Sequence, residues 1–184
     1  ALCMPGGRQF VEAVQRVWDE GDAVLPVDQR LPKKAQLDLI GHMGASVVLD
    51  PAGASSLDGW PVESDDALVV ATSGSTGQPK GVVLEHRALV ANAEATNAFL
   101  RVDPDVDKWL ACLPLSHVGG FSVLVRALHS EAPLEVHDGF DADRVMAAAR
   151  GGVNLVSLVP TAMRRVETGL FRKVLVGGSS VPAN

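Results

Sequence analysis

Several features that would assign the protein to a broad class are missing from its 184 residues. No apolar run approaches the ~20 residues that a membrane-spanning helix needs. Residues 1–7 lack a basic region followed by a long apolar stretch, so no signal peptide is visible. Basic residues are outnumbered by acidic ones, and the net charge of −6 argues against nucleic acid as the main partner.

Cysteine is also scarce. The two cysteines, Cys3 and Cys112, lie far apart in the sequence and match no zinc-binding or redox spacing. A reducing cytoplasm is the simplest interpretation, and we expect neither a membrane nor nucleic acid as a partner. No Gly-x-Ser-x-Gly elbow occurs, and Cys112 lies in an apolar run, so the sequence offers no serine or cysteine nucleophile.

What the chain does contain is an alternation of helix and strand patterns. Apolar residues recur at helical spacing over 8–20, whereas short apolar runs such as 46–49 and 108–113 indicate strands. This alternation predicts an α/β fold with a largely parallel, helix-covered sheet. The other expected strands are 23–25, 67–71, 133–136, 153–159 and 173–176, and the other expected helices are 32–43, 85–100, 121–129, 142–150 and 161–168.

Residues 51–66 show little periodicity and contain Pro and Gly, which predicts a surface loop. We expect this loop to join a first α/β half, residues 1–50, to a second half, residues 67–184. The chain ends shortly after the strand expected at 173–176, and we therefore expect it to be a fragment of a larger domain.

The chain is organised around residues 71–82, which read Ala-Thr-Ser-Gly-Ser-Thr-Gly-Gln-Pro-Lys-Gly-Val. Glycines allow a ligand to approach the backbone, backbone N–H groups and hydroxyls donate hydrogen bonds, and Lys80 adds a positive charge, as a phosphate site requires. The stretch is not a Walker A loop, because Pro79 precedes the lysine and Gly81 stands where Ser or Thr is needed. An ordinary Gly/Ser turn is the alternative interpretation.

Two further loops follow expected strands. Residues 113–120 place His117 between a proline and a glycine pair, and residues 177–182 begin with Gly177 and Gly178. Ligands bind at the carboxyl ends of the strands in open α/β sheets, so we expect the three loops to line one crevice. The alternative interpretation of His117 is an ordinary surface residue, as a single histidine in a loop often is. We assign no function to the remaining histidines, which are His42, His86, His129 and His137.

Residues 72–81 resemble the phosphate-binding signature of the acyl-adenylate-forming superfamily, which includes acyl-CoA ligases, luciferases and peptide-synthetase adenylation domains. Residues 113–120 resemble its Leu-Pro-x-x-His-x-x-Gly motif. The resemblance implies part of the large N-terminal AMP-binding domain, with ATP, Mg²⁺ and CoA as cofactors or substrates. It implies two steps: a carboxylic acid attacks ATP to give acyl-AMP and pyrophosphate, and a thiol then takes the acyl group.

The resemblance also implies roles for individual residues. His117 would orient the carboxylate where the ATP phosphates meet the acyl pocket. The wall of the nucleotide and acyl pocket would include Gly177, Gly178 and Ser179. The ATP phosphates would be bound by Thr72, Ser73, Gly74, Ser75, Thr76, Gly77 and Lys80.

The segment Gly-Gly-Phe-Ser-Val-Leu-Val-Arg-Ala-Leu, residues 119–128, looks like the o-succinylbenzoate–CoA ligase branch, which makes a menaquinone precursor. The substrate of that branch carries a second carboxylate. Arginine can hold a carboxylate through two parallel hydrogen bonds, so Arg126 is the candidate for this contact. A solvent-exposed helix arginine is the alternative.

Other parts of the family pattern are missing. The chain has no tyrosine and therefore lacks the family's Tyr-Gly-x-Thr-Glu segment with its metal-contacting glutamate, and no Asp/Glu cluster has clear ligand spacing. We predict no metal ligands in this chain, and we expect the chain without the family's C-terminal lid domain to be a poor catalyst. A nucleotide-binding or interaction module without ligase activity stays the alternative, and a P-loop phosphotransferase is disfavoured.

Overall fold

The computed structural model describes residues 1–72 and 78–178. The chain forms two compact units, Ala1–Leu89 and Val90–Asn184. The division lies inside helix α3 (His86–Leu100) and not in residues 51–66, where the sequence suggested a junction. None of the helices described is long and apolar enough to cross a membrane.

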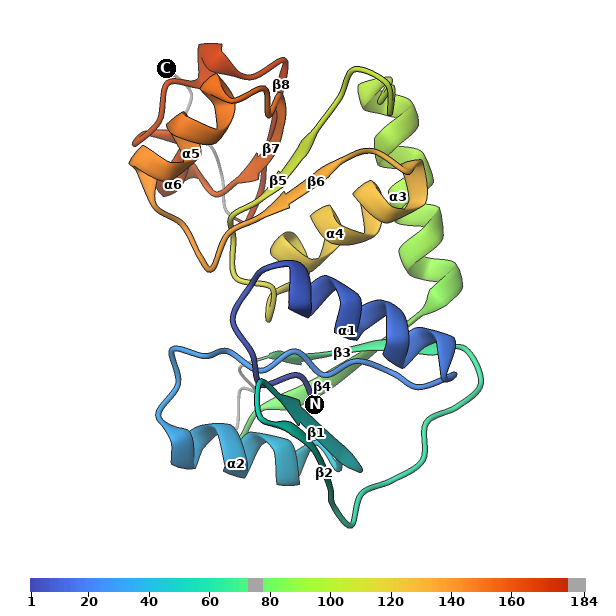
Figure 1. Ribbon diagram of the computed structural model, residues 1–184. Coiled ribbons are helices and arrows are strands. Elements are labelled where there is room, and N and C mark those ends of the chain that lie inside the picture. Colours follow the sequence, from blue (N-terminus) through green and yellow to red (C-terminus); the bar gives the residue numbers. More distant parts are fainter. Residues whose placement is uncertain (73–77, 179–184) are drawn as a thin grey trace. The chain divides into compact units, whose positions relative to one another are not determined.

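The described part of the first unit contains two complete helices, two hairpins and the beginning of α3 (Figure 1). The elements are α1 (Arg8–Asp19), α2 (Lys33–His42), β1 (Val47–Asp50), β2 (Gly53–Ser56), β3 (Asp66–Thr72) and β4 (Lys80–Glu85). Figure 1 shows α1 and α2 on opposite sides of β1, and both helices bury apolar side chains. Phe10 and Val14 of α1 and Ile40 of α2 are almost inaccessible to solvent.

Short parallel bridges connect the two hairpins. Leu2 bridges both Pro26 and Leu49, and Val24 bridges Leu68, so two extended segments lie between β1 and β3. The strand expected at 23–25 is therefore present only as this bridged segment. Leu25 and Val27 belong to the apolar core of the unit.

Two features of this unit differ from the expectation. Residues 53–56 form β2, which pairs antiparallel with β1, so the expected loop at 51–66 contains a strand. β3 and β4 are also antiparallel, with Thr72 opposite Lys80. Seven residues separate the end of β3 from the start of β4, whereas a crossover between parallel strands needs about a dozen or more. The phosphate-loop candidate is therefore the connection between the two strands of a hairpin.

The second unit is built on a parallel sheet. Its strands lie in the order β6-β5-β7-β8, and every neighbouring pair is parallel, which confirms the expected α/β fold in this unit. Besides α3, its elements are β5 (Trp109–Ala111), α4 (Val118–Ser130), β6 (Leu134–Val136), α5 (Ala142–Arg150), β7 (Leu155–Leu158), α6 (Pro160–Met163), the 3-10 turn η1 (Thr168–Leu170) and β8 (Lys173–Val176).

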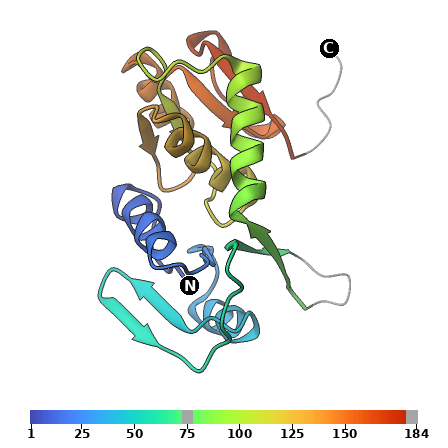
Figure 2. The same cartoon turned by 90° about the vertical axis from the view of Figure 1, so that its right-hand side faces the viewer.

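Helices cover both faces of this sheet, as Figures 1 and 2 show. Leu110 and Val156 pack into one apolar cluster with Val145 of α5. The alternate residues Trp109 and Ser157 contact Arg126 of α4 on the opposite face. This alternation is the period of two expected of β-strands, and the burial of both faces explains why β5 is apolar throughout and β7 is apolar except at Ser157.

Candidate functional site

The connections of the parallel sheet indicate a candidate ligand site between β5 and β7. The chain leaves β5 for α4 on one face of the sheet, and leaves β7 for α6 on the other face. Neighbouring strands whose connections diverge in this way leave a crevice at their carboxyl ends, where open α/β sheets bind ligands. The loop with His117 follows β5 and therefore lies at this edge.

His117 occupies the N-cap position of α4. Its backbone is extended, with φ −114° and ψ 145°, and its carbonyl oxygen accepts hydrogen bonds from Gly120 N at 3.1 Å and Phe121 N at 3.0 Å. The imidazole makes no capping hydrogen bond, and the residue is exposed. The helix start therefore holds the backbone of His117 while its side chain is available to a ligand.

Of the two glycines that follow His117, Gly119 and Gly120, the second is required by the packing of α4. A Cβ atom at Gly120 would lie 2.3 Å from the carbonyl oxygen of Pro114 and 2.7 Å from that of Leu113. Only glycine allows the first turn of α4 to lie this close to the loop that follows β5. At Gly119 a Cβ atom would meet nothing within 4 Å, so only the second glycine is needed for packing.

Gly177 and Gly178 lie at the same edge of the sheet. The N–H of Gly177 donates to the carbonyl of Leu158 at 3.1 Å, which continues the pairing of β8 with β7. Gly178 has φ +87°, a left-handed conformation that favours glycine. Two of the three expected loops thus belong to one sheet edge, and Ser179 lies outside the described residues.

Arg126 is half-buried rather than a surface residue of α4. Its Nη1 donates to Ser157 Oγ at 3.3 Å and its Nη2 donates to Asn92 Oδ1 at 3.4 Å. Its Cζ lies 6.0 Å from the centre of the Trp109 ring. In the part of the chain that the structure describes, no carboxylate comes within ion-pair distance of this guanidinium, and its Nε has no hydrogen-bond partner.

The environment of Arg126 is therefore that of an uncompensated cation. Burial lowers the pKa of the Arg126 guanidinium from its ordinary value, because desolvation disfavours the charged form. A bound anion would restore the lost stabilisation, and carboxylates suit the planar guanidinium fork. The partners of this arginine were missed in the sequence, since Trp109, Ser157 and Asn92 come from three other elements.

The candidate phosphate loop belongs to the first unit, and only its two ends are described. Thr72 ends β3, and its Oγ1 donates to the carbonyl oxygen of Lys80 at 3.1 Å. Lys80 is exposed and forms no ion pair with any described residue. The predicted phosphate ligands Ser73, Gly74, Ser75, Thr76 and Gly77 lie outside the described residues.

Neither a protein-only metal site nor a reactive cysteine is found among the described residues. No three His, Cys, Asp or Glu side chains gather there to hold a metal ion. These residues therefore do not fit a complete Mg²⁺ site. Cys112 is fully buried, and burial raises the pKa of its thiol to about 12, so the thiolate that a nucleophile needs is disfavoured.

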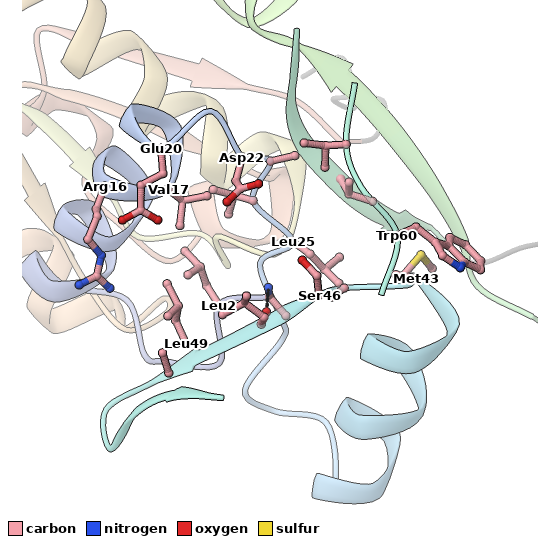
Figure 3. Close-up of a pocket in the computed structure, with 18 residues that line it drawn as sticks. Leu2, Arg16, Val17, Glu20, Asp22, Leu25, Met43, Ser46, Leu49 and Trp60 are labelled. Atoms are coloured by element: carbon pink, nitrogen blue, oxygen red, sulfur yellow. Dashed lines mark hydrogen bonds between the residues drawn. The ribbon is translucent and has the colours of Figure 1, made fainter. Parts of the chain in front are cut away.

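A separate cavity of about 340 Å³ lies in the first unit (Figure 3). Val24, Leu25 and Val69 contribute to its apolar lining, and Arg16, Glu20 and Asp22 lie at one side. None of the described residues that are predicted to bind ATP or the acid lines it. The cavity therefore does not coincide with the site that the motifs indicate.

Comparison with known proteins identifies the family. The profile of the AMP-binding enzyme family matches residues 50–183, which include the phosphate-loop candidate, His117 and Arg126. The chain belongs to the AMP-binding enzyme family. The resemblance to adenylate-forming enzymes is therefore confirmed.

Curated relatives of this AMP-binding chain are 2-succinylbenzoate–CoA ligases. The Escherichia coli enzyme is 31% identical over 181 residues, which cover 88% of this chain and 39% of the relative. The Lactococcus lactis enzyme is 33% identical over 121 residues, which cover 63% of this chain and 27% of the relative. The chain thus spans well under half the length of these relatives.

Solved structures agree on the fold. An o-succinylbenzoate CoA synthetase from Bacillus subtilis, in complex with an acyl-adenylate intermediate, superimposes with a TM-score of 0.82 at 20% identity, covering 97% of this chain and 55% of that one. A variant of the E. coli enzyme MenE with bound OSB-AMS gives a TM-score of 0.73 at 27% identity, covering 98% of this chain and 44% of that one. The α/β fold is thus that of the N-terminal region of these enzymes.

Proposed function

We propose that this chain is the part of an AMP-forming acid–thiol ligase that binds the ATP phosphates and the acid. The acid is o-succinylbenzoate and the acceptor is CoA, so the product is a precursor of menaquinone. The proposal is supported by the names of the relatives, which are 2-succinylbenzoate–CoA ligases. The chain spans 39% of the E. coli relative, and the complete reaction needs the remainder of such an enzyme as well.

The surroundings of Arg126 are the main structural support for o-succinylbenzoate as the acid. A half-buried guanidinium with neutral partners and no carboxylate among the described residues suits a substrate that brings a carboxylate of its own. o-Succinylbenzoate has two carboxylates, one for activation and one for this contact. A monocarboxylic acid would leave Arg126 with its neutral partners and no carboxylate to balance its charge.

The other residues have the roles that the motifs suggest. Lys80 and the hydroxyls of Ser73, Ser75 and Thr76 hold the ATP phosphates, while the Thr72 hydroxyl holds the carbonyl of Lys80. His117 orients the reacting carboxylate, and Gly177, Gly178 and Ser179 form a wall of the nucleotide pocket. Positioning and electrostatic stabilisation supply the catalysis. Mg²⁺ bound to the phosphates of ATP would neutralise part of their charge. A cytoplasmic location is part of the proposal and is supported by two free cysteines.

Acid-dependent exchange of pyrophosphate into ATP tests this function in the protein encoded by the complete reading frame. We expect exchange with o-succinylbenzoate and much slower exchange with 4-oxo-4-phenylbutanoate, which lacks the ring carboxylate. Lys80→Ala should weaken MgATP binding by about 10-fold or more, since a hydrogen bond to a charged group contributes about 1.5–3 kcal/mol. MgATP binding without exchange for any acid would favour a non-catalytic nucleotide-binding module instead.

A further inference from the structure

The last turn of α2 contacts the residue that precedes Lys80. His42 Nε2 lies 3.0 Å from the carbonyl oxygen of Pro79. A carbonyl oxygen only accepts hydrogen bonds, so Nε2 carries the proton and donates. Proline has no N–H, and this carbonyl is therefore the only backbone group through which Pro79 can be held by a hydrogen bond.

A second contact on the same hairpin involves Met43, the residue that follows α2. A Cβ atom at Gly81 would lie 2.9 Å from Met43 Sδ and 3.1 Å from Val69 Cγ1. The absence of a side chain at Gly81 therefore lets the end of α2 approach β4 closely. Met43 and Val69 also pack on the same apolar cluster of the first unit. The segment 79–81 is thus fixed on both sides of Lys80.

We propose that His42 is a positioning residue for the phosphate site, through its hydrogen bond to Pro79. It does not contact ATP itself. Together with the Thr72 hydroxyl, which donates to the carbonyl of Lys80, it holds the backbone from which the lysine side chain projects. A lysine on a fixed backbone loses less conformational freedom when it binds phosphate, and binding is tighter for that reason. The inference rests on the proposed role of Lys80.

A purely structural explanation of His42 makes a different prediction. A histidine in the last turn of a helix can stabilise that helix through the dipole, and this effect depends on positive charge. The positioning role depends instead on a hydrogen-bond donor. Glutamine retains an N–H donor but has no charge, so His42→Gln separates the two roles.

The test measures the dissociation constant of MgATP by calorimetry, and the unfolding temperature, for the wild type, His42→Ala, His42→Gln and Lys80→Ala. His129→Ala is the matched control, because His129 lies on α4 in the other unit. We expect His42→Ala to raise the dissociation constant about 2- to 10-fold, the range of one typical hydrogen bond. His42→Gln should restore most of this loss, and His129→Ala should change nothing.

Each other outcome decides a specific point. If Lys80→Ala weakens binding while His42→Ala does not, the role of His42 is overturned and that of Lys80 stands. If His42→Gln binds as weakly as His42→Ala, with the same unfolding temperature, the hydrogen bond to Pro79 is not the cause. If Lys80→Ala leaves the dissociation constant unchanged, or the wild type binds no MgATP, the proposed function fails and the role of His42 fails with it.

Discussion

The guanidinium of Arg126 lies over the indole ring of Trp109, with Cζ 6.0 Å from the ring centre. Trp109 is completely buried, and its Nε1 has no hydrogen-bond partner among the described residues. An aromatic face attracts a cation without neutralising it. This pair therefore holds Arg126 within the second unit while its charge remains available to an anion.

Arg126→Met tests the second-carboxylate contact. We expect pyrophosphate exchange with o-succinylbenzoate to fall by about 10- to 100-fold, because a hydrogen-bonded charge contributes about 1.5–3 kcal/mol. Exchange with 4-oxo-4-phenylbutanoate should change little. Arg150→Met, an exposed arginine at the end of α5, is the matched control. An equal loss with both acids would assign Arg126 to general stability rather than to substrate binding.

Gly120→Ala should destabilise the second unit. The added Cβ would overlap the carbonyl oxygen of Pro114, a backbone atom that cannot rotate away. We expect a loss of about 1–3 kcal/mol in the free energy of unfolding, the usual cost of forcing extra atoms into a packed site. Gly119→Ala should be neutral or stabilising, since a Cβ there has open space and alanine favours helices. Urea unfolding of both variants checks this difference, and equal midpoints would contradict it.

Asp107 and Arg172 form an ion pair that links the start of β8 to the loop before β5. The Asp107 side chain is 0% exposed, and Arg172 Nε donates to its Oδ1 at 2.7 Å. Arg172→Met leaves this carboxylate buried and unpaired, and we expect a loss of about 3–5 kcal/mol in unfolding free energy. The double variant with Asp107→Leu should lose less than the sum of the two single variants. Additive losses, measured by urea unfolding, would show that the two residues act independently.

Glu135 should make stability depend on pH. Lys108 Nζ donates to Glu135 Oε2 at 2.7 Å, and this hydrogen bond is the main cause of the lowered pKa of the Glu135 carboxyl. Burial opposes the shift, and a weaker hydrogen bond from His137 adds to it. A carboxyl whose pKa is lower in the folded state stabilises the fold above its unfolded pKa of about 4.3. That stabilisation is lost as the pH falls through the lower, folded pKa.

Lys108→Met checks this sign. At pH 7 the variant should be less stable than the wild type by up to about 1 kcal/mol, as for a partly exposed ion pair. The difference should shrink as the pH falls below the ordinary carboxyl pKa, because the wild type then loses the same interaction. Unfolding free energies at several pH values measure this trend. A difference that stays constant with pH would mean that Lys108 acts through packing alone.

Local patterns predicted the second unit well. Helix α5 and strand β8 have the predicted bounds, and Asp141 is the N-cap, with its Oδ1 accepting from Arg144 N at 2.9 Å. These features depend on residues close in sequence. The predicted helix at 161–168 is shorter, because regular helix ends at Met163 and only a 3-10 turn follows.

The first unit was harder to predict because its strands are short and paired at a distance. β2 carries Gly-Ala-Ser-Ser, a sequence without strand character, and it forms only against β1. The pairing of Thr72 with Lys80 made β3 and β4 a hairpin where a parallel sheet was expected. His42 was assigned no function, since nothing near it in sequence indicates that it reaches Pro79.

Residue patterns alone identified the family resemblance, the alternation of helices and strands in the second unit, and the candidates Lys80, His117 and Arg126. Each of these depends on residue order and spacing within short segments. The position of Arg126 over Trp109 and the hydrogen bond from His42 to Pro79 became visible once the elements were placed in three dimensions. Trp109 and Arg126 are 17 positions apart in the sequence, and His42 and Pro79 are 37 apart. Contacts between residues so far apart depend on how the elements pack and not on local conformational preference.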